Sequence, residues 1–133
     1  MQRREFALPP SDVEYLDSRY SDWDAIKIGS ANWLIISQFA VPGGYTVATT
    51  QVALRIEPGY PDTQIDMAYF HPALRRQDGK SIPASESTET IDGKAFQRWS
   101  RHRTSENPWR PGIDDVSTHL VQVQHWFARE IHK

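Results

Sequence analysis

Residues 96 to 112 concentrate the side chains of this 133-residue sequence that could do chemistry. The run holds a serine hydroxyl (Ser100), an imidazole (His102), four guanidinium groups and two indoles. A serine hydroxyl is a weak nucleophile unless a base lies within hydrogen-bond reach and donors stabilise the developing oxyanion. This composition is typical of an acyl-transfer site. It is equally typical of a loop that anchors tryptophans in the core and leaves its arginines in water.

Ser100 is the candidate nucleophile and His102 is the nearest base in the sequence. If the segment is extended, residues two apart point to the same side, so these two side chains could be neighbours while Arg101 points away. The alternative is that the Ser100 hydroxyl bonds to the loop backbone, as loop serines commonly do. The sequence leaves both interpretations open.

Other chemistries have weaker support. The sequence has no cysteine, which excludes disulfides, thiolate metal sites and thiol nucleophiles. Its five histidines form no recognised ligand motif, so no metal site or cofactor is predicted. No glycine-rich loop lies between a strand and a helix, as a phosphate site would need. The net charge of -2 gives no general attraction to nucleic acid or to a membrane surface, and neither is predicted as a partner.

Length and composition predict one globular domain over residues 1–133. The apolar fraction of 38% and the fifteen aromatic residues (five each of Trp, Tyr and Phe) suit a packed core. The basic N-terminus is not followed by an apolar run, and no window approaches the roughly 20 apolar residues of a membrane span. We therefore expect a cytoplasmic location.

The first predicted element is a short helix. Ser11 is expected to be its N-cap and Glu14, three residues later, to complete a capping box. Val13, Leu16 and Tyr20 fall on one face of this helix. We expect that face to cover part of a sheet.

The chain then changes to a period of two, which predicts strands at residues 24–28, 32–39, 45–56 and 65–70. Short turns rich in glycine and proline separate them, and strands joined by such turns form an antiparallel meander. Residues 73–95 show no periodicity and are predicted to form a long loop, which in a compact domain is usually functional or mobile.

An amphipathic helix is predicted at the C-terminus. Asp114 and Asp115 suit its positive N-terminal end, and His132 and Lys133 suit its negative C-terminal end. Its apolar stripe consists of residues spaced three or four apart, namely Ile113, Val116, Leu120, Val123, Phe127 and Ile131. This stripe is the predicted cover for the apolar face of the sheet.

This order of elements resembles the ubiquitin-conjugating enzyme (UBC-like) fold, and short motifs strengthen the likeness. Pro58-Gly59-Tyr60-Pro61 is similar to the family's Pro-x-Tyr-Pro turn, and Trp109-Arg110-Pro111 is similar to its Trp-x-Pro. His71-Pro72 is a weaker match to its His-Pro-Asn. The bacterial branch called prokaryotic family E is resembled in more detail, in Gly59-Tyr60-Pro61-Asp62, Ile65-Asp66-Met67, Arg98-Trp99-Ser100-Arg101-His102 and Trp109-Arg110-Pro111-Gly112. The resemblance covers the chain from about residue 8 to its end.

The resemblance implies an α+β fold with a short N-terminal helix, a four-stranded antiparallel meander, a long active-site loop and a C-terminal helix. It also implies a carrier step in a bacterial conjugation pathway, with antiphage defence as one setting. A ubiquitin-like protein, activated with ATP by an adenylating enzyme, is passed to this protein and then to an amine on a protein target.

The eukaryotic members carry a cysteine before the Trp-x-Pro motif, and the corresponding position here falls at Arg101, with Ser100 adjacent. Without a thiol no thioester can form, and Ala73 stands where the family's oxyanion-stabilising asparagine would be. Serine can instead accept an acyl group as an oxyester. The resemblance therefore implies Ser100 as acyl acceptor with His102 as general base. It assigns oxyanion stabilisation or carrier binding to Arg98, Arg101, Arg103, Trp99 and Trp109. The alternative is a non-catalytic module that binds the ubiquitin-like protein or its activating enzyme.

Overall fold

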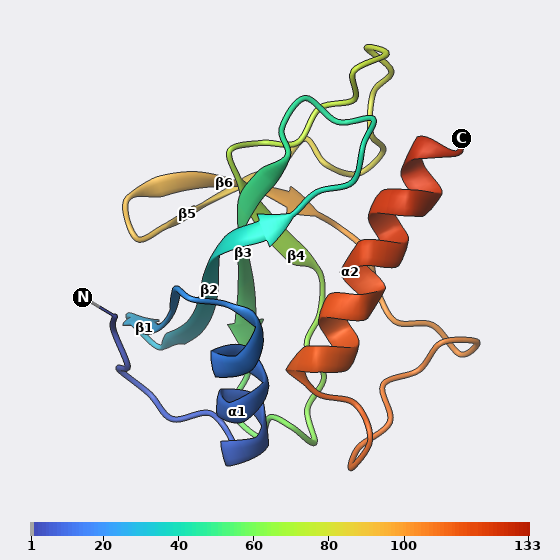
Figure 1. Ribbon diagram of the computed structural model, residues 1–133. Coiled ribbons are helices and arrows are strands. Elements are labelled where there is room, and N and C mark those ends of the chain that lie inside the picture. Colours follow the sequence, from blue (N-terminus) through green and yellow to red (C-terminus); the bar gives the residue numbers. More distant parts are fainter. Residues whose placement is uncertain (1) are drawn as a thin grey trace.

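The computed structural model describes residues 2–133, which form two helices and one six-stranded sheet (Figure 1). In chain order the elements are α1 (Pro10–Arg19), β1 (Trp23–Ile28), β2 (Ala31–Ala40), β3 (Thr49–Ile56), β4 (Ala68–His71), β5 (Thr88–Ile91), β6 (Lys94–Trp99) and α2 (Val116–Ile131). Neighbouring strands are antiparallel, in the spatial order β1-β2-β3-β4-β6-β5. The predicted meander is confirmed as β1 to β4, and a β5–β6 hairpin extends it.

Two of the predicted strands begin later than expected. The third begins at Thr49 rather than at residue 45, because Tyr45 pairs with Arg76 in an isolated bridge outside the strand. The fourth begins at Ala68 rather than at residue 65. Met67, just before it, has a φ of 61°, and this left-handed conformation is incompatible with a continuous strand.

The prediction of a loop over residues 73–95 is wrong in its second half, which contains β5 and the start of β6. The strand was missed because Thr88, Glu89 and Thr90 are all exposed, so β5 has no alternation of apolar and polar residues. A two-residue Asp92-Gly93 turn joins it to β6, with φ values of 52° and 81°. Such a dipeptide is a strong hairpin signal when two strands flank it.

The predicted capping box of α1 is also wrong. Pro9 occupies the N-cap position, no side chain caps the helix, and Pro10 is the first helical residue. Proline suits that first position because its fixed φ is already helical and its missing N–H has no partner there anyway. Ser11 and Glu14 therefore lie within the first turn and a half and are exposed.

The C-terminal helix is confirmed, with a later start than its apolar stripe predicted. Asp115 is the N-cap, and it forms a capping box with Thr118. Ile113 lies before the helix in a turn and is 60% exposed, so it is not part of the stripe. The buried residues of α2 are Val116, His119, Leu120, Val123, Phe127 and Glu130. A histidine and a glutamate therefore share the face that packs on the sheet.

Each face of the sheet has a buried cluster of its own. The larger cluster lies between the sheet and the helices and contains Leu16 of α1 and Phe127 of α2. The smaller one lies on the opposite face and is made of Ile26, Trp33, Ile35, Ala53, Tyr69, Ile91 and Phe96, so all six strands contribute. The sheet is curled (Figure 1), and a 2.9 Å ion pair from Arg3, beside β1, to Asp92 in the β5–β6 turn links its two ends.

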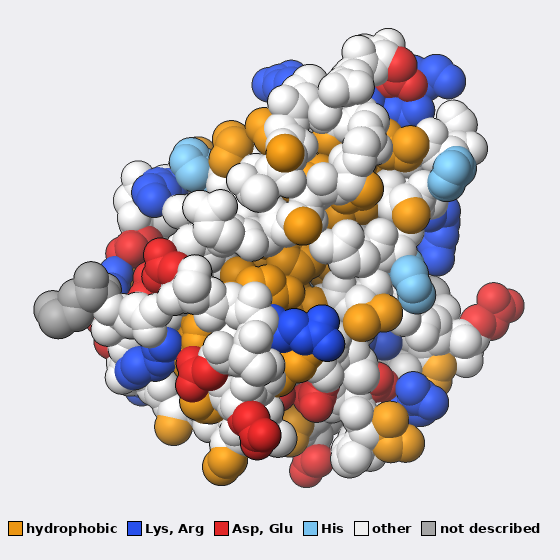
Figure 2. Space-filling view, viewed as in Figure 1, with side chains coloured by type: hydrophobic (Ala, Val, Ile, Leu, Met, Phe, Trp, Pro, Cys, Tyr) orange, Lys and Arg blue, Asp and Glu red, His pale blue; other side chains and the backbone are white. Residues whose placement is uncertain are grey.

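The helix-bearing side of the molecule is shown in Figure 2, where acidic side chains gather low in the view, around α1. Glu14 and Asp17 are the exposed acidic residues of that helix. Within residues 2–133, neither helix has the length and apolar character needed to cross a bilayer.

Candidate functional site

Ser100 lies where the chain leaves β6, directly after Trp99. Its main-chain N–H donates to the Ala84 carbonyl at 3.0 Å, and the N–H of Arg98 donates to the Ser87 carbonyl at 2.9 Å. These two bonds keep residues 84–87 beside β6 as far as the serine. Ser100 is partly exposed, and within the described residues its hydroxyl has no hydrogen-bond partner, so the sequence alternative of a hydroxyl bonded to the loop backbone is not what the structure has.

Strand alternation divides the residues of β6 between the two faces of the sheet. Trp99 points to the helix side, where it is fully buried against Phe70 and Phe127. The proposed contact between Trp99 and a carrier is therefore wrong, because this indole is part of the core. Arg98 lies on the other face, and Ser100 follows the last residue of the strand.

His102 is held by a carboxylate and not by the serine. Its Nδ1 lies 3.0 and 3.1 Å from the two carboxylate oxygens of Asp66, and its ring is 61% exposed. Nδ1–H donates to the carboxylate in this arrangement, which leaves Nε2 as the free acceptor. No hydrogen bond joins His102 to Ser100 in the described residues. The structure therefore supplies a base with an orienting partner, two residues beyond the candidate nucleophile.

The position of Asp66 depends on the buried face of α2. His119 is 1% exposed, and its Nε2–H donates to the Met67 carbonyl at 2.8 Å. Burial lowers the pKa of His119 from 6.5 to about 4, so the ring is neutral at physiological pH. Met67 has the left-handed conformation described above. The bond from α2 thus fixes the turn that carries Asp66 to His102.

The three arginines predicted near the serine have different surroundings. Arg101 lies over the Trp99 ring at 4.9 Å, donates to the Pro83 carbonyl at 3.0 Å and is 3.5 Å from the buried carboxylate of Glu130. The guanidinium of Arg101 therefore lies on the helix side of the sheet, against Trp99 and Glu130. Burial lowers the pKa of Arg101. One of its terminal nitrogens also donates to the main-chain carbonyl of Ser100 at 3.3 Å, so its contact with the serine residue is to the backbone and not to the hydroxyl.

Arg103 stacks over the Trp109 ring at 5.2 Å, with one guanidinium nitrogen 3.5 Å from Nδ1 of His119. Arg98 differs from both, because its Nε is buried and has no hydrogen-bond partner. A buried donor without a partner is uncommon and calls for an explanation. Of the three, Arg98 alone has no side-chain hydrogen bond or ion pair in residues 2–133.

The Pro-Gly-Tyr-Pro turn and the Trp-x-Pro motif hold the scaffold together. The Tyr60 hydroxyl donates to the buried Asp12 carboxylate at 2.6 Å and accepts from the Val116 N–H at 2.8 Å. The Trp109 indole N–H donates to the Pro61 carbonyl at 2.9 Å. Burial raises the pKa of Tyr60 and keeps its hydroxyl protonated. These bonds tie α1, the turn and the start of α2 to one another.

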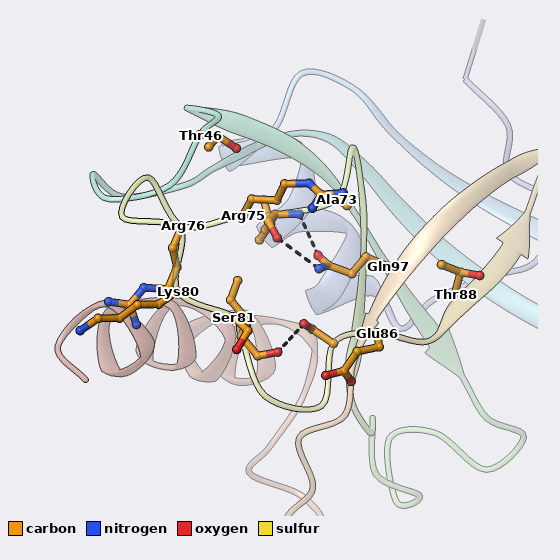
Figure 3. Close-up of a pocket in the computed structure, with 13 residues that line it drawn as sticks. Thr46, Ala73, Arg75, Arg76, Lys80, Ser81, Glu86, Thr88 and Gln97 are labelled. Atoms are coloured by element: carbon orange, nitrogen blue, oxygen red, sulfur yellow. Dashed lines mark hydrogen bonds between the residues drawn. The ribbon is translucent and has the colours of Figure 1, made fainter.

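A polar cavity of about 540 Å³ lies near the site, between the segment after β4 and the start of β5 (Figure 3). Gln97 lines it and is fully engaged, since its amide bonds both the N–H (2.8 Å) and the carbonyl (3.1 Å) of Leu74. Arg75 and Thr88 also line it, and neither side chain has a hydrogen-bond partner in the described part of the chain. Among residues 2–133 no group of three or more His, Asp or Glu side chains could hold a metal ion.

The sequence predicted Ser100 and His102 as candidates, but it did not indicate the contacts that Asp66 and His119 make around them. The contact between Asp66 and His102 joins residues 36 positions apart, and no local pattern indicates it. His119 gave a usable signal, because it follows Val116 by three positions and so falls on the buried stripe of α2.

A helix, an antiparallel meander and a covering C-terminal helix, with a candidate acyl-acceptor position ahead of the last helix, define a UBC-like protein. The sequence model of prokaryotic E2 family E matches residues 8–130, and the chain therefore belongs to this family. No significant match was found among curated proteins or among solved structures. Membership places the chain broadly in ubiquitin-like conjugation, where the general partners are ubiquitin-like proteins and their activating enzymes. Unlike the eukaryotic members with a catalytic cysteine, this chain has no cysteine.

Proposed function

We propose that Ser100 accepts the C-terminal acyl group of a ubiquitin-like protein as an oxyester and passes it to an amine on a protein target. Residues 1–133 act as one UBC-like domain in this proposal. The observation that carries it is the placement of Ser100 at the exit of β6, with an unbonded hydroxyl, two residues before a histidine that Asp66 orients.

In the first step the Ser100 oxygen attacks the activated carbonyl carbon of the carrier, and the new C–O bond replaces the bond to the activating group, which leaves. His102 Nε2 takes the hydroxyl proton, and Asp66 stabilises the imidazolium that results. The terminal guanidinium nitrogens of Arg98, which have no hydrogen-bond partner in residues 2–133, are the donors proposed for the oxyanion of the tetrahedral intermediate. The two side chains must approach for this transfer, and catalytic hydrogen bonds often form only when substrate is bound.

In the second step the target amine attacks the ester carbonyl and the serine oxygen leaves. His102 returns its proton to that oxygen, which restores the free hydroxyl. The amine loses a proton to solvent, so the sum of the two steps is transfer of one acyl group. Serine esters withstand thiols, whereas thioesters do not, and this difference gives the test its readout.

The test is incubation of the protein with its activating enzyme, ATP and ubiquitin-like protein. We expect an adduct that survives thiol and is cleaved by alkali. Ser100→Ala should abolish it, whereas Ser105→Ala, a change at an exposed serine nearby, should leave it unchanged. Ser100→Cys should form an adduct that thiol now cleaves. Charging of the activating enzyme without any adduct on the wild-type protein contradicts the proposal.

The second candidate is a non-catalytic UBC-like module that binds the ubiquitin-like protein or its activating enzyme. The observation that favours it is the absence of a bond between Ser100 and His102, together with Ala73 at the position of the family's asparagine. This function predicts partner binding that Ser100→Ala and His102→Ala leave intact, with no adduct in any variant. Titration calorimetry of both variants against the two partners distinguishes it from the first candidate.

A further inference from the structure

The two edges of the sheet are protected differently. At the β1 edge the N-terminal segment pairs with the strand, because Ala25 donates to the Arg3 carbonyl at 2.8 Å and accepts from the Glu5 N–H at 2.7 Å. At the other edge, no segment of residues 2–133 pairs with the outer side of β5. Residues 88–90 are all exposed there. Within residues 2–133, the outer side of β5 is therefore an open strand edge, in the hairpin that leads into Ser100.

The hairpin geometry identifies which main-chain groups are free. A two-residue turn makes the flanking residues Ile91 and Lys94 a hydrogen-bonded pair. Pairs alternate along an antiparallel ladder, so Thr90 and Thr88 belong to non-hydrogen-bonded pairs and direct their N–H and C=O groups away from β6. The bond from Arg98 to Ser87 agrees with this alternation. β5 thus offers two donors and two acceptors to an added strand.

The course of a strand that adds antiparallel to β5 follows from the same topology. A segment that pairs antiparallel with β5 runs in the same direction as β6, because β5 and β6 are themselves antiparallel. Its C-terminal end therefore arrives beside Thr88, at the end of the hairpin where β6 leads into Ser100. Residues 84–87 continue from β5 along β6 up to the serine, since Ala84 accepts from the Ser100 N–H. A carboxyl-terminal segment on this edge is thus delivered towards the hydroxyl.

We propose that the β5 edge binds the extended C-terminal segment of the ubiquitin-like protein by strand addition, an inference that rests on the proposed function of Ser100. The added strand lies two inter-strand spacings from β6, about 10 Å, which about three extended residues span. With about three more residues paired to β5, roughly the last six residues of the carrier are engaged.

Two features at the end of this edge suit such a segment. Thr88 and Gln97 are register partners on one face of the hairpin, and both line the cavity in Figure 3. A side chain of the added strand beside Thr88 points to the same face and has room in this cavity of about 540 Å³. On the opposite face, Arg98 is partly exposed and its terminal guanidinium nitrogens have no hydrogen-bond partner in residues 2–133, so they are available to a carbonyl of the segment as it crosses to Ser100.

The test is Thr90→Pro, which removes an outward N–H and places a ring on the open edge without breaking a bond to β6. Thr90→Val is the matched control, because it changes the side chain and keeps the N–H. We expect Thr90→Pro to weaken binding of the ubiquitin-like protein about tenfold, as the loss of one or two hydrogen bonds predicts. Thr90→Val should bind as the wild type does. Equal binding by both variants overturns the inference.

Hydrogen exchange provides a second readout that needs no substitution in β5. In Ser100→Ala, which cannot be acylated, the ubiquitin-like protein should slow amide exchange at Thr88 and Thr90. A carrier that lacks its last six residues should not. Unchanged exchange at both amides overturns strand addition even if Ser100 is acylated. If both amides are protected but the wild-type protein forms no oxyester, the carrier binds by strand addition and the proposed function of Ser100 is wrong.

Discussion

His119 should make the folded protein less stable as the pH falls from about 6.5 towards 4. The ring is 1% exposed and its pKa in the folded state is about 4, against 6.5 in the unfolded chain. Between these two values the unfolded chain binds a proton that the folded protein does not. Stability from this group is therefore complete above about pH 6.5 and is lost progressively as the pH falls towards 4.

The size of the effect follows from the same two values. One pH unit corresponds to about 1.4 kcal/mol, so the full contribution is about 3 kcal/mol. About 2 kcal/mol of this should be lost between pH 7.5 and pH 5, because most of the titration of the unfolded histidine falls within that interval. The carboxylates whose folded pKa values are lowered, Glu5, Asp78 and Asp114, titrate mainly below this interval.

Urea unfolding of the wild type and of His119→Gln at pH 7.5, 6 and 5 measures this contribution. The glutamine amide can still donate to the Met67 carbonyl but does not titrate, so all other groups cancel in the difference. We expect the stability advantage of the wild type over the variant to shrink by about 2 kcal/mol between pH 7.5 and 5. An advantage that stays constant over this range refutes the account of His119 as a buried neutral histidine.

Two further predictions concern the scaffold and the base. Tyr60→Phe should destabilise the protein by about 2–3 kcal/mol in urea unfolding, because it leaves the buried Asp12 carboxylate and the Val116 N–H without their partner; a loss below about 0.5 kcal/mol contradicts that role. Asp66→Asn should slow oxyester formation in a single turnover by about 10- to 100-fold while carrier affinity stays unchanged, because Asp66 acts only through His102. Asp66→Glu should recover part of the rate, and equal losses in rate and affinity would indicate a merely structural residue.

The parts of the fold that the sequence predicted are those with a strong periodic signal. The strand around Leu34 and the helix around Leu120 alternate or repeat clearly and were placed to within a few residues. β5 was missed because an exposed edge strand buries only Ile91 and so carries almost no pattern. The Asp92-Gly93 dipeptide is the one local signal for this hairpin, and it indicates a turn only when a strand is recognised on each side of it.

The site was predictable to the extent that its chemistry is local. Ser100 and His102 are two residues apart and could be considered together, but the structure has neither a hydrogen bond between them nor the alternative bond from the serine hydroxyl to the loop backbone. Asp66 reaches His102 only because Met67 turns the chain with a positive φ, and a side chain on α2 holds that turn. Such a contact depends on how three elements pack, which no short stretch of sequence specifies.

The most direct test of the central claim is tandem mass spectrometry of the protein after reaction with its activating enzyme, ATP and ubiquitin-like protein. The account predicts that the C-terminal residues of the ubiquitin-like protein are found attached to the Ser100 oxygen. Treatment of this peptide with alkali should restore the mass of the unmodified peptide. A remnant found only on a lysine, or on a serine other than Ser100, contradicts it.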